Sequence, residues 1–194
     1  MRRLALWGAI VALLLSTGGG AEASIGRALD LAELVRRADR IALVTALDRQ
    51  SSWDARGRIV TDTRLRVDRS LKGGPAEAPI VVRCFGGEIG EIGMRVEGEP
   101  SFEPGARALV FLRAQGAGPM RPVGLSQGVL PVRELGGREM VLPGGAGLLL
   151  QRREGGELRS APSALTQARA LDAFLLELAD RIEASGPSRA GDRP

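Results

Sequence analysis

The most regular feature of the chain is an alternation of hydrophobic and polar positions between residues 58 and 71. One set of alternate positions is apolar or carries threonine: Ile59, Thr61, Thr63, Leu65 and Val67. The positions between them are mostly charged. A period of two places one face of a β-strand on a core and the other in water. The pattern therefore predicts a strand with one buried face.

Other segments also have the length and composition of strands. Residues 41–47, 80–85 and 106–113 are nearly unbroken apolar runs, too short for independent helices, so we expect buried strands with 106–113 at the centre. Pro131 has no backbone N–H, which predicts that its strand lies at an edge. Further short strands separated by glycine-bearing turns are predicted at 120–125, 128–133, 138–142 and 148–152.

Loops and helices are indicated elsewhere. Residues 50–57 are polar and contain glycine, which predicts a loop, and the glycine-rich residues 86–93 predict a loop with positive φ angles or close backbone approach. Apolar residues at helical spacing predict a short helix over 28–38, capped by Asp30. The same spacing predicts an amphipathic C-terminal helix over 163–184.

The predicted strands lie in the middle of the chain, between two amphipathic helices, and strands and helices do not alternate. This order predicts a mainly β fold. We expect a small antiparallel barrel or sandwich with helical ends. The predicted organisation is a β-barrel domain with its leading helix over 24–160, a C-terminal helix packed on that domain over 161–185, and a disordered tail over 186–194.

The N-terminal segment has the pattern of a secretory signal. Two arginines precede the apolar residues 4–15, and small residues flank Glu22 in Ala21-Glu22-Ala23. Signal peptidase cuts after this arrangement of a positive start, a short apolar run and small residues at −3 and −1. The apolar run is shorter than the ~20 residues of a spanning helix. We therefore expect residues 1–23 to be cleaved, leaving a periplasmic or extracellular chain with no stable membrane span.

Composition removes several classes of function. The sequence has no histidine and one cysteine, Cys84, which argues against Ser/His/Asp or Cys/His catalysis and the usual zinc sites. Without residues 1–23 the net charge is +3 and five aromatic residues remain, so a nucleic-acid partner is not expected. Cys84 follows an apolar run, which favours burial over pairing between chains. We expect no cofactor and no metal.

An acidic segment is the candidate binding surface. Residues 88–103 hold five glutamates against one arginine, a net charge of −4, which would steer a basic partner or attract calcium; a solvated loop is the simpler alternative. Phe102 is interpreted as a plug tying this segment to the core rather than an exposed anchor. Trp53 is interpreted as a buried cover at one end of the barrel rather than an anchor for a partner. The candidate binding residues are Glu88, Glu91, Glu97, Glu99, Phe102, Glu103 and Trp53.

One resemblance bears on the fold. The run Ala38-Asp39-Arg40-Ile41-Ala42-Leu43-Val44, followed by 61–71 and Lys72-Gly73, resembles the start of the OB-fold domain in tissue inhibitors of metalloproteinases and netrin-like modules. The run from Gly86 to Leu112 is similar to exported bacterial proteins of uncharacterised function. The resemblance implies an OB-like barrel with extra strands. Those inhibitors chelate the protease zinc through an N-terminal cysteine, which Ser24-Ile25-Gly26 lacks, so inhibition by that route is not expected.

These observations together predict a non-catalytic exported binding module that recognises a protein or an envelope polymer, with another exported protein as the expected partner. Two alternatives stay open. A hydrolase using carboxylates alone would need a concave site with convergent polar groups of perturbed pKa. A structural envelope component would pair through Cys84 or an edge strand.

Overall fold

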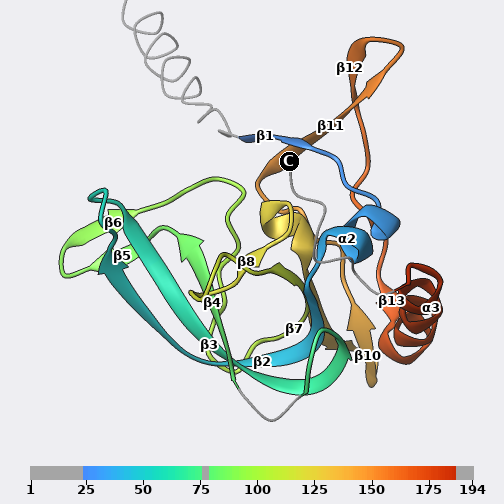
Figure 1. The fold of residues 1–194 in the computed structure, drawn as a ribbon, viewed down its shortest axis with the longest axis horizontal. Coiled ribbons are helices and arrows are strands. Elements are labelled where there is room, and N and C mark those ends of the chain that lie inside the picture. Colours follow the sequence, from blue (N-terminus) through green and yellow to red (C-terminus); the bar gives the residue numbers. More distant parts are fainter. Residues whose placement is uncertain (1–23, 76–78, 187–194) are drawn as a thin grey trace, which may run out of the picture.

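The structure, a computed structural model, describes residues 24–75 and 79–186. The predicted signal peptide, and the predicted tail apart from Gly186, lie outside the described residues. The fold is mainly β, as predicted, with one large antiparallel sheet (Figure 1). The order of its strands is β13 (Arg169–Ala170), β10 (Arg138–Val141), β9 (Val129–Leu135), β7 (Arg107–Arg113), β2 (Arg40–Trp53), β3 (Ile59–Lys72) and β4 (Ile80–Phe85), with β8 (Arg121–Pro122) paired to β7.

Strands β2 and β3 form a long hairpin that dominates the sheet. The predicted alternation in β3 is confirmed, because Thr63, Leu65 and Val67 are buried while the arginines between them are exposed. Strand β2 runs to Trp53, so the prediction of a loop over 50–57 is wrong for its first four residues. These polar residues remain in the strand because their backbones pair with β3, Trp53 lying opposite Ile59. The side chains need no burial when the partner strand supplies the hydrogen bonds.

Strand β7 is central, as its apolar sequence predicts, and lies between β2 and β9. Alternate residues of β7 enter two different cores. Leu109 and Phe111 pack with the helices in one core, and Val110 and Leu112 pack with β3 and β4 in the other. Burial of both faces explains why the segment is an unbroken apolar run.

The two described helices cover one end of the sheet. The predicted helix α2 (Leu31–Arg37) is confirmed with its cap: Glu33 N–H donates to the Asp30 carboxylate at 2.7 Å, in a capping box. Helix α3 (Leu171–Ala184) begins eight residues later than predicted. The preceding residues of β13 pair with β10 instead, which satisfies their backbone groups without a helix. Of the predicted C-terminal segment 161–185, residues 171–184 form the helix, and Leu165 before it is buried in the helix-side core.

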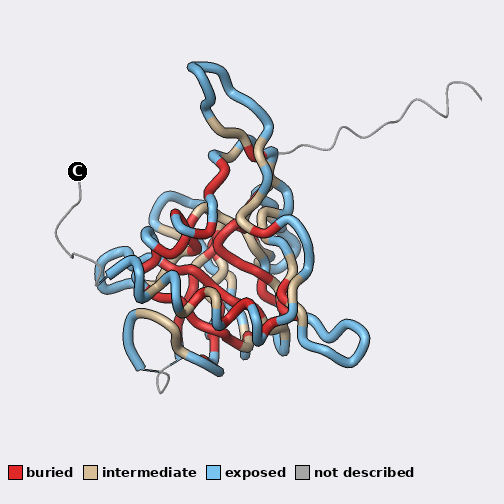
Figure 2. The backbone as a smooth tube through the Cα atoms, turned by 90° about the vertical axis from the view of Figure 1, so that its right-hand side faces the viewer, coloured by how far each residue is buried: buried red, intermediate tan, exposed pale blue. Residues whose placement is uncertain are grey.

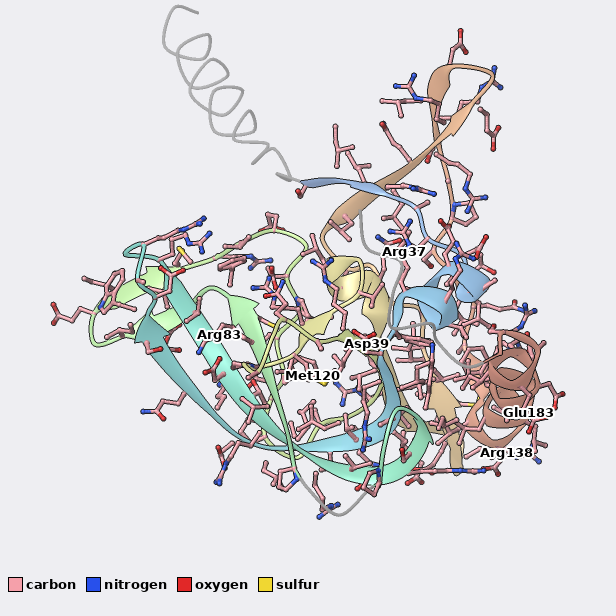
Figure 3. All side chains as sticks on the ribbon, in the orientation of Figure 1. Arg37, Asp39, Arg83, Met120, Arg138 and Glu183 are labelled. Carbon is pink, nitrogen blue, oxygen red and sulfur yellow. The ribbon has the colours of Figure 1, made fainter. Side chains whose placement is uncertain are left out.

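The described strands do not close into a barrel, so that part of the fold prediction is not found. The sheet path ends at β13 and β4. Only a single parallel bridge, Val82 to Met120, reaches from β4 toward β8. In this bridge Arg83 N–H donates to the Met120 carbonyl at 2.9 Å, and Met120 N–H donates to the Val81 carbonyl at 2.8 Å. Figure 3 labels Arg83 and Met120.

The expected edge position of Pro131 is also wrong, since β9 lies between β7 and β10. The proline is tolerated because it lies just beyond the end of β10. Its carbonyl accepts from Leu142 N–H at 2.8 Å, one residue past the last residue of that strand. The missing N–H faces Leu142, as the carbonyl does, so one of the two hydrogen bonds of this pair is lost and the β9–β10 pairing ends at Val132 and Val141.

A second sheet of β1 (Ser24–Arg27), β11 (Leu148–Glu154) and β12 (Glu157–Ser160) projects from the body, as Figures 1 and 2 show. Strand β1 pairs with β11 in parallel. The segment 86–93, predicted as a glycine-rich loop, forms a small hairpin of β5 (Gly87–Ile89) and β6 (Ile92–Met94). A 3-10 turn, η1 (Leu125–Gly128), follows β8. Within residues 24–75 and 79–186, no helix has the length and apolar character that crossing a bilayer requires.

Candidate functional site

A cleft of about 870 Å³ lies beside the end of the β2–β3 hairpin. Its walls come from the paired ends of β2 and β3, the end of β4, the β5–β6 hairpin, residues 95–103, which connect β6 toward β7, and residues 146–147. Strand β5 packs beside β2 and β3, and these elements lie together on the left of Figure 1. We call this space the acidic cleft, because glutamates are the commonest charged residues of its lining.

Most of the predicted binding residues meet at this cleft. The structure brings five of them to its walls: Glu88, Glu97, Glu99, Phe102 and Glu103. Glu91, in the exposed turn of the β5–β6 hairpin, and Trp53, at the end of β2, lie outside the lining.

Arginines neutralise part of the predicted acidic field. Glu97 pairs with Arg95 at 2.7 Å, and Glu103 pairs with Arg49 at 2.5 Å. These pairs are largely exposed, so each contributes little to stability but cancels charge locally. The lining contains four glutamates and these two arginines, a net charge of −2. The cleft is therefore acidic, but less so than the sequence of residues 88–103 indicates.

Glu99 differs from the other four glutamates because it is buried. Its side chain is 4% exposed and its Oε1 accepts from Arg121 Nη2 at 2.6 Å. Its Oε2 is buried and accepts no hydrogen bond of regular geometry among the described residues, although the Cys84 thiol and the Phe85 backbone N–H lie close enough to favour the charged carboxylate. Burial raises the pKa of the Glu99 carboxyl, and the Arg121 guanidinium opposes that shift. A buried acceptor without a partner costs about 1–3 kcal/mol, which marks Glu99 as a group to be explained.

The position of Glu99 corrects an interpretation made from the sequence. Glu97 and Glu99 look equivalent there, and reversing both charges looks like a surface change. In the structure only Glu97 is a surface group, whereas reversing Glu99 would place two cations together in the interior. Arg121, the partner that holds Glu99, was not identified from the sequence, because nothing local connects residues 22 positions apart.

Phe85 and Cys84 form another part of the cleft lining that sequence reasoning missed as site residues. The Phe85 ring contacts two guanidinium groups, Arg58 at 4.3 Å and Arg121 at 4.2 Å from its centroid. Cys84 is buried, as predicted, and burial followed by the neighbouring Glu99 charge raises the pKa of its thiol to about 12. The thiol is therefore almost entirely protonated at neutral pH and is a poor nucleophile.

The glycine-rich stretch has the structural role predicted for it. Gly86 and Gly87 have φ angles of 97° and 133°. A Cβ on Gly87 would collide with the hydroxyls of Ser51 and Thr61, which lie 3.0 Å apart at the cleft wall. Thr61 Oγ1 also donates to the Gly86 carbonyl at 2.6 Å. Glycine is required here because the hairpin backbone touches the hydroxyl groups of the main sheet.

The two aromatic candidates differ in burial. Phe102 is 5% exposed and packs in the core formed by β3, β4 and β7, so the interpretation of Phe102 as a plug is confirmed. Trp53 is 51% exposed, so the prediction that it is a buried cover is wrong. Trp53 is the last residue of β2, and its amphipathic ring stays at the surface.

Within the part of the chain that the structure describes, no three acidic, histidine or cysteine side chains are grouped to hold a metal ion. Comparisons with family models, curated proteins and solved structures found no match for this chain.

Proposed function

We propose that this chain is a non-catalytic binding module that recognises a partner protein through the acidic cleft. The observation that carries the proposal is the cleft itself: four glutamates line it, and the exposed side chains of Trp53 and Ile92 lie on the hairpins beside it. A concave acidic surface beside exposed apolar side chains is suited to bind a basic segment of another protein.

The surroundings of the cleft support recognition of a protein. Trp53 and Ile92, 51% and 56% exposed, stand on the two hairpins that frame it. Exposed aromatic and aliphatic side chains beside a polar cleft are typical anchors in protein interfaces. The high pKa of Cys84 argues against a thiolate nucleophile in the same cleft.

The proposal includes export and a partly closed barrel. Removal of residues 1–23 would deliver the chain to the periplasm or the exterior, where the partner would be another exported protein. Protein recovered outside the cytoplasm should begin at Ser24, and a start at Met1 would reject this part. The Val82–Met120 bridge, which brings β4 toward β8, supports the partly closed, OB-like part of the proposal.

Obstruction of the cleft tests the proposed function. Ser101 is an exposed residue of the cleft lining, so Ser101→Trp places a large side chain at its mouth. Ser160→Trp, on the exposed strand β12, is the matched control. We expect wild type and the Ser160 variant to capture the same envelope proteins, and the Ser101 variant to lose them. Capture by the Ser101 variant at wild-type levels, with an unchanged melting temperature, would reject the cleft as the binding site.

A further inference from the structure

The projecting sheet of β1, β11 and β12 ends in an uncovered edge (Figures 1 and 2). Strand β12 is exposed along its whole length, and Leu158 within it is 61% exposed. One side of β12 pairs with β11, and within residues 24–75 and 79–186 no strand pairs with its other side. An open edge of this kind is a template for another strand.

We propose that this edge pairs with the same edge of a second copy of the chain. The two β12 strands run antiparallel across a twofold axis, with Leu158 of one copy opposite Leu158 of the other. The contact uses no residue of the acidic cleft and goes beyond the proposed function. It follows from the direction of the backbone groups of β12 and from the order of its charges.

The backbone of β12 is oriented for this pairing. Ala161 N–H, just beyond the strand, donates to the Leu150 carbonyl at 2.9 Å. Hydrogen-bonded pairs alternate along an antiparallel ladder, so Glu157 and Arg159 direct their backbone groups at β11. Leu158 therefore directs its N–H and its carbonyl away from β11, toward the open edge. Two copies with Leu158 opposite Leu158 exchange both hydrogen bonds, as one closed pair of the ladder.

The charges of β12 are complementary to themselves in this arrangement. With the twofold axis at Leu158, Glu157 of each copy lies opposite Arg159 of the other, which favours two ion pairs across the edge. Within one chain the opposite residues carry like charges, because Glu157 faces Glu154 and Arg159 faces Arg152. Like charges in that position destabilise a strand pair. A second copy places an opposite charge on the other side of each, so charge complementarity favours this occupant.

The sequence disfavours the neighbouring symmetric registers. An axis at Glu157 or Arg159 would place two like charges directly opposite each other. An axis at Ser160 would bring Leu158 opposite Pro162, which has no N–H to donate. The axis at Leu158 avoids both problems and brings two exposed leucine side chains into contact. Because β12 has only four residues, we expect weak and reversible association.

Exchange of charges within β12 tests the pairing. Sedimentation equilibrium of the purified wild-type chain at submillimolar concentration should show monomers and dimers in exchange. Arg159→Glu places like charges at both ion pairs and should weaken the dimer about tenfold. Adding Glu157→Arg to that variant restores opposite charges, so the double variant should dimerise nearly as well as wild type.

Folding of the hairpin does not confound this comparison. Within the chain Arg159→Glu introduces a charge opposite to that of Arg152, so the β11–β12 pair loses a like-charge contact rather than gaining one. A wild-type chain that stays monomeric, or an Arg159→Glu variant that dimerises as well as wild type, would overturn the inference. So would a double variant that dimerises no better than Arg159→Glu alone.

Disulfide trapping locates the twofold axis. Leu158→Cys places two thiols opposite each other in the dimer, at a separation that a disulfide spans. Leu176→Cys, on helix α3, is the matched control, since Leu176 is 67% exposed. Cys84 is buried in both variants. Mild oxidation should give covalent dimers of the Leu158 variant about tenfold faster than of the control, and equal rates would refute the register.

Discussion

Truncation of Phe102 provides a quantitative test of how residues 95–103 are held against the body. Phe102 is 5% exposed and packs in the same core as Val110 and Leu112. A buried phenylalanine removes about 150–250 Å² from water, worth roughly 4–6 kcal/mol at about 25 cal/mol per Å². That figure is an upper bound because the unfolded chain already buries part of this surface. Substitution by alanine also leaves a methyl group, so we expect Phe102→Ala to cost about 3 kcal/mol.

The assay is urea unfolding followed by far-ultraviolet circular dichroism, which does not depend on the exposed tryptophan. Phe102→Leu is the matched control: it keeps most of the apolar volume and should cost less than about 1.5 kcal/mol. The cleft wall should loosen only in the alanine variant, so ligand capture should fall with it. A loss below about 1 kcal/mol for Phe102→Ala would show that the side chain is not the plug described here, because surface substitutions fall in that range.

Three further predictions follow from the exposure and charge of single residues. Trp53 should show red-shifted emission that acrylamide quenches readily, and blue-shifted, protected emission would contradict its 51% exposure. Arg121→Met should cost about 3 kcal/mol by stranding the Glu99 carboxylate, and adding Glu99→Leu should restore much of the loss. Because the pKa of Glu99 is raised in the folded chain, folding favours the protonated carboxyl, and the free energy of unfolding of the Arg121 variant should fall as pH rises above about 4.5. A free energy of unfolding that does not change with pH would show that the stranded Glu99 carboxylate is not the cause of the lost stability. Cys84, with a thiol pKa of about 12, should resist iodoacetamide at pH 8 until urea unfolds the chain, and rapid labelling of folded protein would contradict its burial.

The sequence correctly grouped residues that line the acidic cleft, but it did not show which of the glutamates is buried. It grouped five residues that do meet at one cleft, because they lie in one stretch of chain that folds back beside the β2–β3 hairpin. It treated Glu99 like Glu97, because burial of a glutamate depends on a distant cation. Arg121 lies 22 residues away, and no spacing rule connects the two.

The sequence by itself determined the elements whose signals are local. The alternation in β3 follows from a period of two, and the start of α2 follows from the hydrogen bond that Asp30 accepts from Glu33 N–H. The apolar run of β7 reflects burial on both faces. These features depend on residues close along the chain, so a short window contains the information that specifies them.

Tertiary structure decided the features that depend on distant partners. Polar residues of β2 stay in a strand because β3 pairs with them, and residues 169–170 pair with β10 instead of extending helix α3. Trp53 is exposed at the end of β2, and Glu99 is buried because it pairs with the distant Arg121. Each outcome is set by which segments come together after folding, and side-chain patterns specify burial within an element far better than they specify its neighbours.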